Sequence, residues 1–396
     1  MAVAAALDAL AGVDPKSIDA LAFATTTAPY REKQSATTIA AALDLPAEIR
    51  TSETGGTLRC GTSALLGALD SAAAGRRVLV TAADCRLGAP SGANEQTFGD
   101  GAAAFVLGDQ GVIANVLAQA SLAREIVETW RDAGDPYVRN WEERFGLTQG
   151  YGPAVAAVAK QVLKDAGLDA KGIAKLVLAA PSEKVHGATA KSLGFAPDRV
   201  ASLLVDRVGV VGCASAPMRL AGALETAKPG DRILVIDYGE GADALVIEVT
   251  DAVASFRPRQ GLAKQIDARR EIDYGAYLRW RESLEMEPPR RPDPRRPSAP
   301  AMFRNYGHNL GLKASRCLKC ATVQFPPQRV CWKCKTRDER EPYALRDKPA
   351  RLSTFTADNL TVSPDPPEIS AVIDFEGGGR MIGNVTDTKL EDLRVG

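Results

Sequence analysis

The sequence has 396 residues, and its 49 Lys and Arg residues balance 49 Asp and Glu residues, so the formal net charge is zero. A hydrophobic fraction of 45% and a charged fraction of 25% are typical of a globular protein with room for two or three domains. Zero net charge gives no general electrostatic reason to expect a nucleic acid partner. No apolar run approaches the roughly 18 residues that a membrane-spanning helix needs, so we expect no membrane partner either.

The N-terminus and the cysteines indicate a compartment. Residues 1–14 lack the basic start of a signal peptide and carry Asp8, so we interpret them as an amphipathic helix. The seven cysteines are odd in number, and four of them cluster between residues 317 and 334. This pattern favours metal ligation in a reducing interior over disulfides, and it predicts a cytoplasmic protein.

An internal repeat organises roughly the first 250 residues. Residues 65–80 return as residues 220–235, which is 155 positions later, and the segment at 14–24 returns with the same offset. Each copy then closes with a glycine turn and an apolar run, GDGAAAFVLGD from Gly99 and GEGADALVIEV from Gly239. The offset there is 140, so the first copy carries an extra loop of 15 residues. Two copies in register predict two similar halves packed about a pseudo-twofold axis.

Within each copy the predicted order is helix, strand, helix, strand, strand. The apolar runs IDALAFA and KLVLAA show no polar alternation, which is typical of strands that are covered on both faces. The segments ALLGALDSAAAG and RLAGALETAKPG place apolar residues at helical spacing and end at a glycine. The strands RRVLVTAAD and DRILVIDYG follow with almost no loop. Each half is therefore predicted to be an α/β unit with a central helix.

These features resemble the 3-hydroxy-3-methylglutaryl-CoA synthase branch of the thiolase superfamily, which is related to ketoacyl carrier-protein synthase III. The likeness rests on CGTSALLGALD, ADCRLGAPSGANEQTFGDGAAAFVLGD and VGVVGCASAP with DYGEGADALV, and it spans roughly residues 1–250. It implies a duplicated thiolase-like fold, a pseudo-twofold arrangement of five α and β layers, with halves at residues 1–150 and 151–252. Because the sequence opens inside a helix where the family has strands, we expect the first half to be incomplete at its N-terminus.

The resemblance also locates four positions of the family site. The glutamate that acts as acid and base corresponds to Thr26, with Glu32 as the nearest carboxylate, and the nucleophilic cysteine corresponds to Leu58. The histidine that polarises the thioester carbonyl corresponds to Ala179, and the asparagine of the second half corresponds to Val210. With all four replaced, the family's Claisen chemistry cannot be carried over residue by residue.

Three other residues are candidates for catalysis. Cys60 lies two residues after the family cysteine position, a shift that turns a helical side chain to nearly the opposite face, so it replaces the nucleophile only if the helix begins later or unwinds. Otherwise Cys60 is a small buried residue, and Cys213 is the pseudo-symmetric mate of Leu58. Glu95 lies in the loop over the acyl site of the related enzymes, with a purely structural loop role as the alternative. His186 either lines the cavity or is structural.

A second module follows residue 252. Residues 253–300 are rich in proline and charge, which is typical of a semi-rigid linker. A helix and a zinc ribbon are predicted at 301–340, where two CxxC pairs can close a tetrahedral site for structural zinc, although an iron site would use the same ligands. Residues 341–396 alternate apolar and polar residues around a GGG turn, which predicts a small antiparallel β-barrel; its resemblance to OB-fold proteins implies an OB-fold that is incomplete at its C-terminus. The predicted metal ligands are Cys317, Cys320, Cys331 and Cys334.

The second module resembles the zinc-ribbon and OB-fold proteins that accompany acyl-CoA thiolases and aldolases, although Ala321 and Lys335 stand where a glycine usually follows each zinc knuckle. The two modules together predict an enzyme that forms or breaks carbon–carbon bonds on coenzyme A thioesters, as an acyltransferase or by an aldol or retro-aldol step. The alternative is a non-catalytic acyl-CoA-binding scaffold subunit of a thiolase complex. The resemblance further implies a homodimer, with a partner thiolase as a second association.

Overall fold

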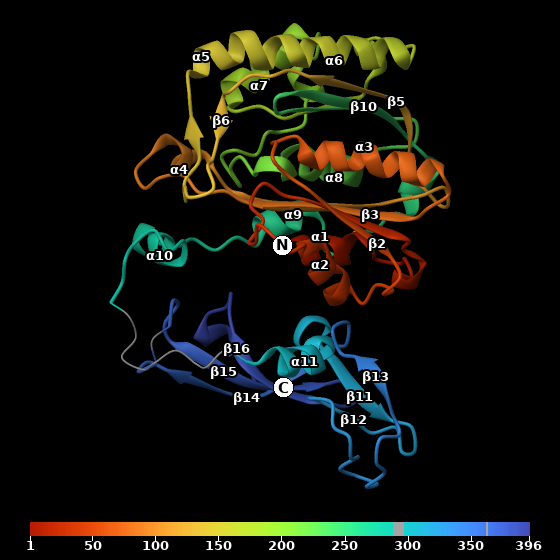
Figure 1. Cartoon of the computed structure of the whole chain (residues 1–396), viewed down its shortest axis with the longest axis vertical. Helices are drawn as coiled ribbons and strands as arrows, with labels where there is room; N and C mark the ends of the chain where they lie inside the picture. Colours follow the sequence, from red (N-terminus) through yellow and green to blue (C-terminus); the bar gives the residue numbers. More distant parts are fainter. Residues whose placement is uncertain (288–296, 362) are drawn as a thin grey trace. The chain divides into compact units, whose positions relative to one another are not determined.

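The computed structural model describes residues 1–287, 297–361 and 363–396. The chain divides into two compact units, Met1–Arg269 and Arg270–Gly396, which we call unit 1 and unit 2 (Figure 1). Unit 1 contains the two repeated halves, and unit 2 contains the cysteine cluster. Among the described residues, no helix combines the length and the apolar character needed to cross a bilayer.

The first half of unit 1 is built on a four-stranded sheet in the order β2-β1-β3-β4. Strand β1 pairs in parallel with β2 and β3, and β3 pairs antiparallel with β4. Both β1 and β3 are almost entirely buried, as their continuous apolar runs predict, whereas the edge strand β2 is polar and half-exposed. The strands are β1 (Ala20–Ala24), β2 (Arg50–Thr54), β3 (Val78–Cys85) and β4 (Asp100–Leu107).

Helices cover both faces of this first sheet. On the outer face, α1 (Ala2–Ala9) and α2 (Ser35–Leu43) share a hydrophobic cluster with Leu79 of β3. On the inner face, α3 (Cys60–Ala73) shares a second cluster with Val80. Adjacent residues of β3 thus point to opposite layers, as the twofold side-chain period of a strand requires.

The second half repeats the design with a sheet in the order β5-β10-β9-β8. Strands β8 and β9 are parallel, and β10 is antiparallel to both β9 and β5. The glycine turn that begins at Gly239 joins β9 to β10. The strands are β5 (Ala114–Ala123), β8 (Lys175–Leu178), β9 (Arg232–Tyr238) and β10 (Gly241–Val249).

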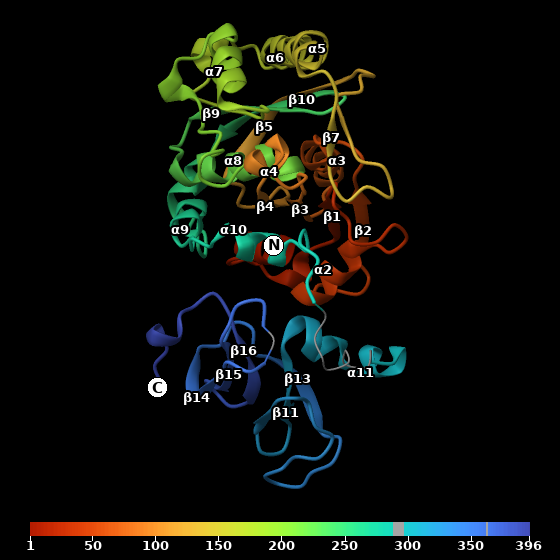
Figure 2. The same cartoon turned by 90° about the vertical axis from the view of Figure 1, so that its left-hand side faces the viewer.

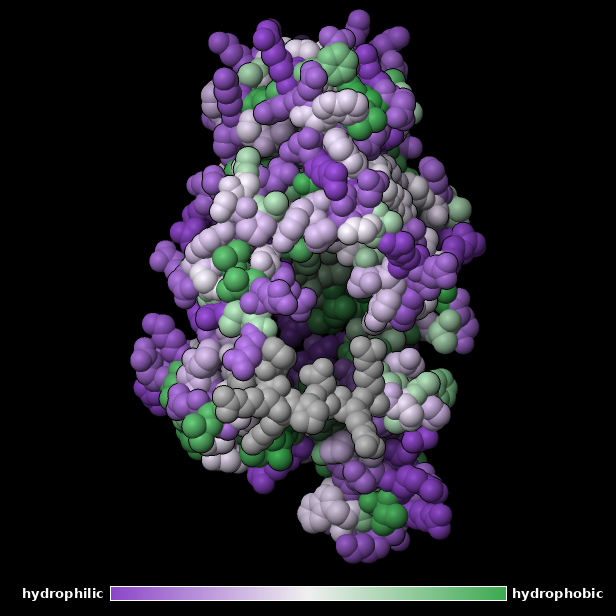
Figure 3. Space-filling view, turned by 60° about the vertical axis from the view of Figure 1, so that its left-hand side comes forward, coloured by the Kyte–Doolittle hydropathy of each residue, from purple (hydrophilic) through white to green (hydrophobic). Residues whose placement is uncertain are grey.

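Five layers result in unit 1, which confirms the predicted fold class (Figures 1 and 2). They run from α1 and α2 through the first sheet, the central helices α3 and α8 (Ser215–Thr226), and the second sheet to α6 (Gly152–Asp165) and α7 (Glu183–Ser192). The central helices approach closely at Gly61, because a Cβ there would lie 3.1 Å from Pro217 Cγ. On the face that Figure 3 presents, hydrophilic side chains gather over α6 and α7.

Short elements connect the layers. The loop between β3 and β4 carries one helical turn, and a two-stranded hairpin and a π-helix over Gly146–Tyr151 lie between β5 and α6. Part of the segment predicted as a linker is helical. These elements are α4 (Ala93–Thr97), β6 (Thr129–Trp130), β7 (Arg139–Asn140), α5 (Glu143–Phe145), α9 (Leu262–Asp267) and α10 (Tyr274–Trp280).

Unit 2 contains two small antiparallel sheets, in the orders β12-β11-β13 and β14-β15-β16. Val323, Leu345 and Phe375 form the buried core that joins them. The closed OB-fold barrel stays a prediction, and the proline-rich part of the predicted linker at 288–296 lies outside the described residues. The elements are α11 (Ala299–Gly311), β11 (Lys313–Cys317), β12 (Val323–Gln324), β13 (Arg340–Ala344), β14 (Ala350–Asp358), β15 (Glu368–Phe375) and β16 (Arg380–Val385).

Candidate active site and metal centre

The two acidic glycine turns occupy pseudo-equivalent places in unit 1. The turn at Gly99 packs against the segment that precedes α8, because the Gly99 amide donates to the Val210 carbonyl at 3.2 Å. The turn at Gly239 packs against the segment that precedes α3, because its carbonyl accepts from Thr57 Oγ1 at 3.1 Å and from Arg59 Nε at 2.7 Å. Each turn therefore contacts the entry to the other half's central helix.

The four positions that the family resemblance assigns lie beside these contacts. Leu58 precedes α3, and a Cβ added to Gly239 would lie 2.9 Å from its backbone nitrogen. Val210 bridges to Phe98 before the other turn. Ala179 follows β8, and its carbonyl accepts a hydrogen bond from Tyr151 Oη at 3.0 Å. No hydrogen bond of the described residues joins these side chains to one another.

Asp84 holds the fourth position, Thr26, in place. This carboxylate is 1% exposed at the end of β3, and its Oδ1 accepts from the Thr26 amide at 2.6 Å and from Thr25 Oγ1 at 3.0 Å. Its Oδ2 accepts from Thr26 Oγ1 and from the Cys213 amide, both at 2.8 Å. Since Cys213 lies just before α8, one buried carboxylate ties the loop after β1 to the start of a central helix.

A buried arginine lies next to this carboxylate. Arg86 is 4% exposed, and its guanidinium stacks 4.2 Å from the Phe98 ring centroid. Burial lowers the pKa of Arg86 to about 10, and the Asp84 charge opposes this decrease. The guanidinium is therefore still charged at neutral pH. The positive charge remains beside Asp84, at the carboxyl edge of the first sheet.

A second buried carboxylate, Asp243, anchors the start of α3. It is 1% exposed and accepts from Arg59 Nη1 at 2.6 Å and from Ser63 Oγ at 2.7 Å. Asp237 lies opposite it on β9, and Thr62 Oγ1 lies 3.3 Å from Asp237 Oδ2. Complete burial raises the pKa of Asp237 to about 7, and the like charge of Asp243 adds to this increase.

Three proton-carrying groups gather on the other side of the Gly239 turn. Tyr238 Oη donates to Glu128 Oε1 at 2.5 Å, and burial raises the pKa of both groups. The Glu240 charge also raises the pKa of both groups. Glu240 has a left-handed backbone, with φ at 43°, and its Oε2 is buried with no hydrogen-bond partner. The packing around this group leaves little room, because a side chain at Gly150 would collide with Tyr238 and Glu128.

The three predicted catalytic residues lie on three different helices. Cys60 is the first residue of α3 and is fully buried against Cys213. The hydrogen bond with Cys60, together with burial, raises the pKa of the Cys213 thiol. Glu95 lies in α4, where its Oε2 accepts from the Ser91 amide at 2.6 Å. His186 is buried in α7. No hydrogen bond that the structure describes connects these three, and their catalytic roles stay predictions.

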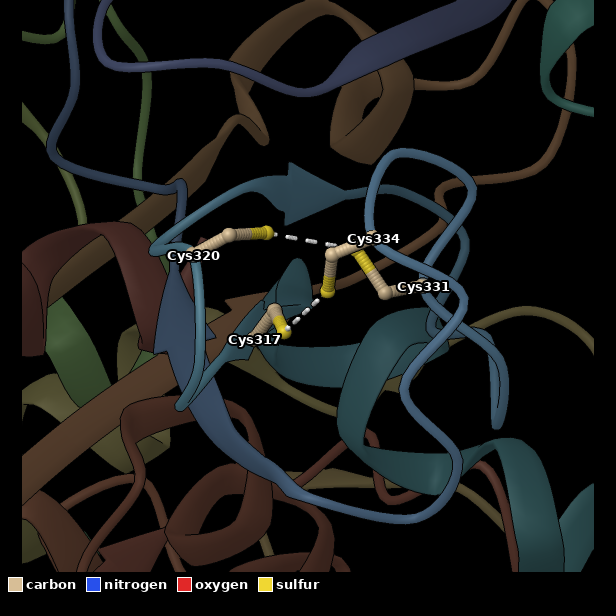
Figure 4. A group of neighbouring side chains, drawn as sticks. All are labelled: Cys317, Cys320, Cys331 and Cys334. Carbon is tan, nitrogen blue, oxygen red and sulfur yellow. Dashed lines mark hydrogen bonds between the residues drawn. The ribbon is translucent and has the colours of Figure 1, made fainter.

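The predicted metal ligands converge in unit 2 (Figure 4). The four Sγ atoms of the cluster lie within 4.8 Å of one another, with Cys317 to Cys334 at 3.6 Å and Cys320 to Cys331 at 3.5 Å. Four zinc–sulfur bonds of about 2.3 Å in a tetrahedron place the sulfurs about 3.8 Å apart, so this donor set fits Zn²⁺. With four protein ligands no coordination position is open, and the zinc is structural.

The residues after the two knuckles adopt the conformation that a glycine usually supplies. Ala321 and Lys335 have φ values of 58° and 61°. Each amide closes its knuckle by donating at 2.9 Å to the carbonyl of the first cysteine, Cys317 or Cys331. A side chain in the left-handed region costs about 1 kcal/mol relative to glycine, so each knuckle carries a small strain.

Comparisons with known protein families agree with this division. Residues 163–249 match the family described as 3-oxoacyl-[acyl-carrier-protein (ACP)] synthase III C terminal. Residues 311–339 match the ChsH2, rubredoxin-like zinc ribbon domain. The first match covers most of the second half of unit 1, and the second contains all four cysteine ligands.

Curated relatives and solved structures extend the likeness to most of the chain. The hydroxymethylglutaryl-CoA synthase of Methanopyrus kandleri is 31% identical over 293 residues, which is 72% of this chain and 83% of that protein. The synthase of Aeropyrum pernix is 33% identical over 72% of this chain and 81% of its own length. MvaS in complex with 3-hydroxy-3-methylglutaryl coenzyme A aligns with a TM-score of 0.61 and 22% identity, covering 74% of this chain and 82% of that one. The 3-oxoacyl-[acyl-carrier-protein] synthase III of Aquifex aeolicus aligns with a TM-score of 0.57 and 23% identity, covering 63% of this chain and 83% of that one.

Proposed function

Because the chain belongs to the hydroxymethylglutaryl-CoA synthase family of the thiolase superfamily, we propose that unit 1 binds an acyl-CoA thioester and makes or breaks a carbon–carbon bond beside its thioester carbonyl. The observation that carries this proposal is the 31% identity to a synthase over 83% of that protein's length. The bound coenzyme A thioester in a structural neighbour of the same fold is consistent with it.

The proposed reaction is an aldol addition or its reverse, without an acyl-cysteine intermediate. The family's cysteine position corresponds to Leu58, and the nearby Cys60 is fully buried. In the addition, a base removes a proton from the α-carbon of the acyl group, and this carbon bonds to a carbonyl carbon of the second substrate. The alkoxide that forms then takes a proton from an acid. The cleavage reverses these steps. Neither direction needs a nucleophilic side chain of the enzyme or a further reactant.

Glu240 is the proposed base, and the pair of Tyr238 and Glu128 is the proposed acid. Glu240 supports the first role because it follows the glycine that packs against Leu58 and has a carboxylate oxygen without a hydrogen-bond partner. Burial and Glu128 raise the pKa of Tyr238, which keeps the phenol protonated and able to donate. The N-terminal end of α3 supplies a positive dipole for the enolate oxygen.

Exchange of α-protons for solvent deuterium tests this chemistry. The protein is incubated with acetyl-CoA or acetoacetyl-CoA in D₂O, and mass spectrometry measures deuterium in the acyl group. We expect Glu240→Gln to reduce the enzyme-dependent exchange rate at least ~100-fold, as the loss of a general base does. Glu248→Gln is the matched control, since this β10 glutamate pairs at the surface with Arg232. Equal exchange in wild type and Glu240→Gln would remove Glu240 from the mechanism.

The proposal also includes association. Thiolase-like proteins commonly form dimers, so we propose a homodimer of unit 1, and a thiolase is the proposed second partner through the zinc-ribbon module. If coenzyme A thioesters bind and no α-proton exchange occurs in the isolated protein, a binding subunit of a thiolase complex becomes the better description. Adding a candidate thiolase then separates the two functions, because only a scaffold would require it for turnover.

A further inference from the structure

Three buried polar side chains on α7 and α8 have atoms without hydrogen-bond partners. Arg219 is 2% exposed, and His186 and Ser215 are each 5% exposed. The unpartnered atoms are Arg219 Nη1, His186 Nε2 and Ser215 Oγ. Buried polar atoms in folded proteins are almost always paired with protein, water or an ion, so each of these requires an explanation. Neither the fold nor the proposed chemistry uses any of them.

Arg219 is the strongest of the three observations, because it is a buried cation with an incomplete set of acceptors. Its Nε donates to the Leu203 carbonyl at 3.0 Å, and its Nη2 donates to the same oxygen. These bonds leave the Nη1 edge of the guanidinium unused. Burial lowers the pKa of Arg219 to about 10, so the group is still charged at neutral pH.

The nearby carboxyl groups do not supply a full counter-charge. Asp237 and Glu183 are the acidic groups that act on Arg219. Asp237 has its pKa raised to about 7 by burial, so it is only partly ionised at neutral pH. Glu183 is 56% exposed and therefore screened by solvent. A buried guanidinium without a fixed partner is unfavourable, and a bound anion would offset its charge.

The three groups belong to one region of unit 1, where α7 and Arg219 meet at Leu203. Ser215 and Arg219 are four residues apart on α8, so their side chains share one face of the helix. His186 lies on α7, whose Ala190 shares a hydrophobic cluster with Leu203, the residue whose carbonyl accepts from Arg219. Burial and the Arg219 charge lower the pKa of His186 to about 4, so the imidazole is neutral at pH 7. A neutral imidazole donates one N–H, which can be the N–H at Nε2. Together they offer guanidinium, hydroxyl and imidazole donors.

We propose that His186, Ser215 and Arg219 form a buried site for one monovalent anion, either a halide-sized ion or a carboxylate group. One guanidinium charge matches one negative charge, and the other two donors are neutral. The site itself is independent of the carbon–carbon bond chemistry, whereas a substrate carboxylate as its ligand rests on the proposed function. The anion has two sources, free in solution or on the acyl group of a substrate.

Bromide titration of the full-length protein tests the site. Melting temperature is measured at constant ionic strength while sodium 2-hydroxyethanesulfonate, whose anion is bulkier than a halide and has no carboxylate group, is replaced by sodium bromide. A ligand at about 100 times its dissociation constant should raise the melting temperature by roughly 5–10 °C. We expect this rise in wild type and its loss in Arg219→Met. If wild type and Arg219→Met respond equally to bromide, or neither responds, the proposal is wrong.

A milder variant keeps the test decisive if Arg219→Met does not fold. Ser215→Ala removes one neutral donor and should weaken bromide binding about 3- to 10-fold, as the loss of one such hydrogen bond does. Unchanged bromide affinity in Ser215→Ala would contradict the site. Arg232→Met, at a surface ion pair, is the matched control for loss of an arginine.

A competition experiment with coenzyme A thioesters distinguishes the two sources of the anion. Succinyl-CoA carries a carboxylate on its acyl chain, and acetyl-CoA does not. If succinyl-CoA removes the bromide-dependent stabilisation and acetyl-CoA does not, the site binds the carboxylate of a substrate. If neither thioester affects it, the site holds a free anion. Anomalous scattering from a bromide-soaked crystal locates the ion directly, and a map with no bromide peak beside Arg219 Nη1 would overturn the proposal.

Discussion

Replacing Asp84 with asparagine should destabilise unit 1 strongly, because this carboxylate joins two elements of the candidate site. Two donors, Thr26 Oγ1 and the Cys213 amide, reach Oδ2 at 2.8 Å. The Thr25 hydroxyl and the Thr26 amide reach Oδ1. In Asp84→Asn, an amide nitrogen replaces one of the two oxygens, so the backbone amide of either Thr26 or Cys213 faces a donor, and the remaining hydrogen bonds lose the carboxylate charge.

A hydrogen bond to a charged group contributes about 1.5–3 kcal/mol and a neutral one about 1 kcal/mol, so losing one bond and neutralising the others should lower the free energy of unfolding by roughly 3–6 kcal/mol. In a unit of this size, that loss lowers the melting temperature by roughly 6–20 °C. Scanning calorimetry of the full-length protein measures it. The control is Asp169→Asn, since Asp169 is an exposed cap residue and asparagine caps equally well. A melting temperature of Asp84→Asn within about 2 °C of wild type would show that the Asp84 hydrogen bonds do not stabilise unit 1.

Three further predictions concern the metal centre and a buried carboxyl. Removing zinc with a chelator should unfold the ribbon of unit 2. The measurement is hydrogen exchange, in which the amides of β11 and β13 should lose their protection. Retained protection would contradict a structural role for the zinc. Lys335→Gly should stabilise unit 2 by about 1 kcal/mol, and a decrease in melting temperature would argue against left-handed strain at this position. Burial raises the pKa of Asp237 from 3.8 to about 7, so the folded chain holds a proton that the unfolded chain releases in this range. The free energy of unfolding should therefore fall as pH rises from 4 to 7, and Asp237→Asn should flatten this dependence. Equal slopes of the free energy against pH in wild type and Asp237→Asn would contradict the raised pKa.

The sequence predicted the parts of the fold that depend on local patterns. The buried strands β1, β3, β8 and β9 are continuous apolar runs, and the cysteine ligands follow from their spacing alone. The edge strand β2, RTSET, has no such signal, because an edge strand with half-exposed side chains needs no apolar run. The prediction of a barrel in unit 2 depends on an alternation of apolar and polar residues, and this alternation fits the three-stranded sheet β14-β15-β16 equally well.

The candidate site was less accessible to sequence reasoning, because its contacts join distant positions. Asp84 lies within a motif that carries the family resemblance, yet its partners are 58 and 129 residues away, so its role emerges only from the structure. Glu240 had a usable signal. The offset of 140 places it opposite Asp100, so the internal repeat marks both glycine turns as acidic at the same position.

The central claim, carbon–carbon bond chemistry without an acyl-cysteine intermediate, is tested most directly by intact-protein mass spectrometry. The protein is incubated with acetyl-CoA and acetoacetyl-CoA and analysed under native and denaturing conditions. We expect retained coenzyme A thioester mass in the native spectrum and no covalent acyl adduct in the denatured one. A stable acyl adduct that maps to Cys60 or Cys213 would contradict it and establish a displaced nucleophile.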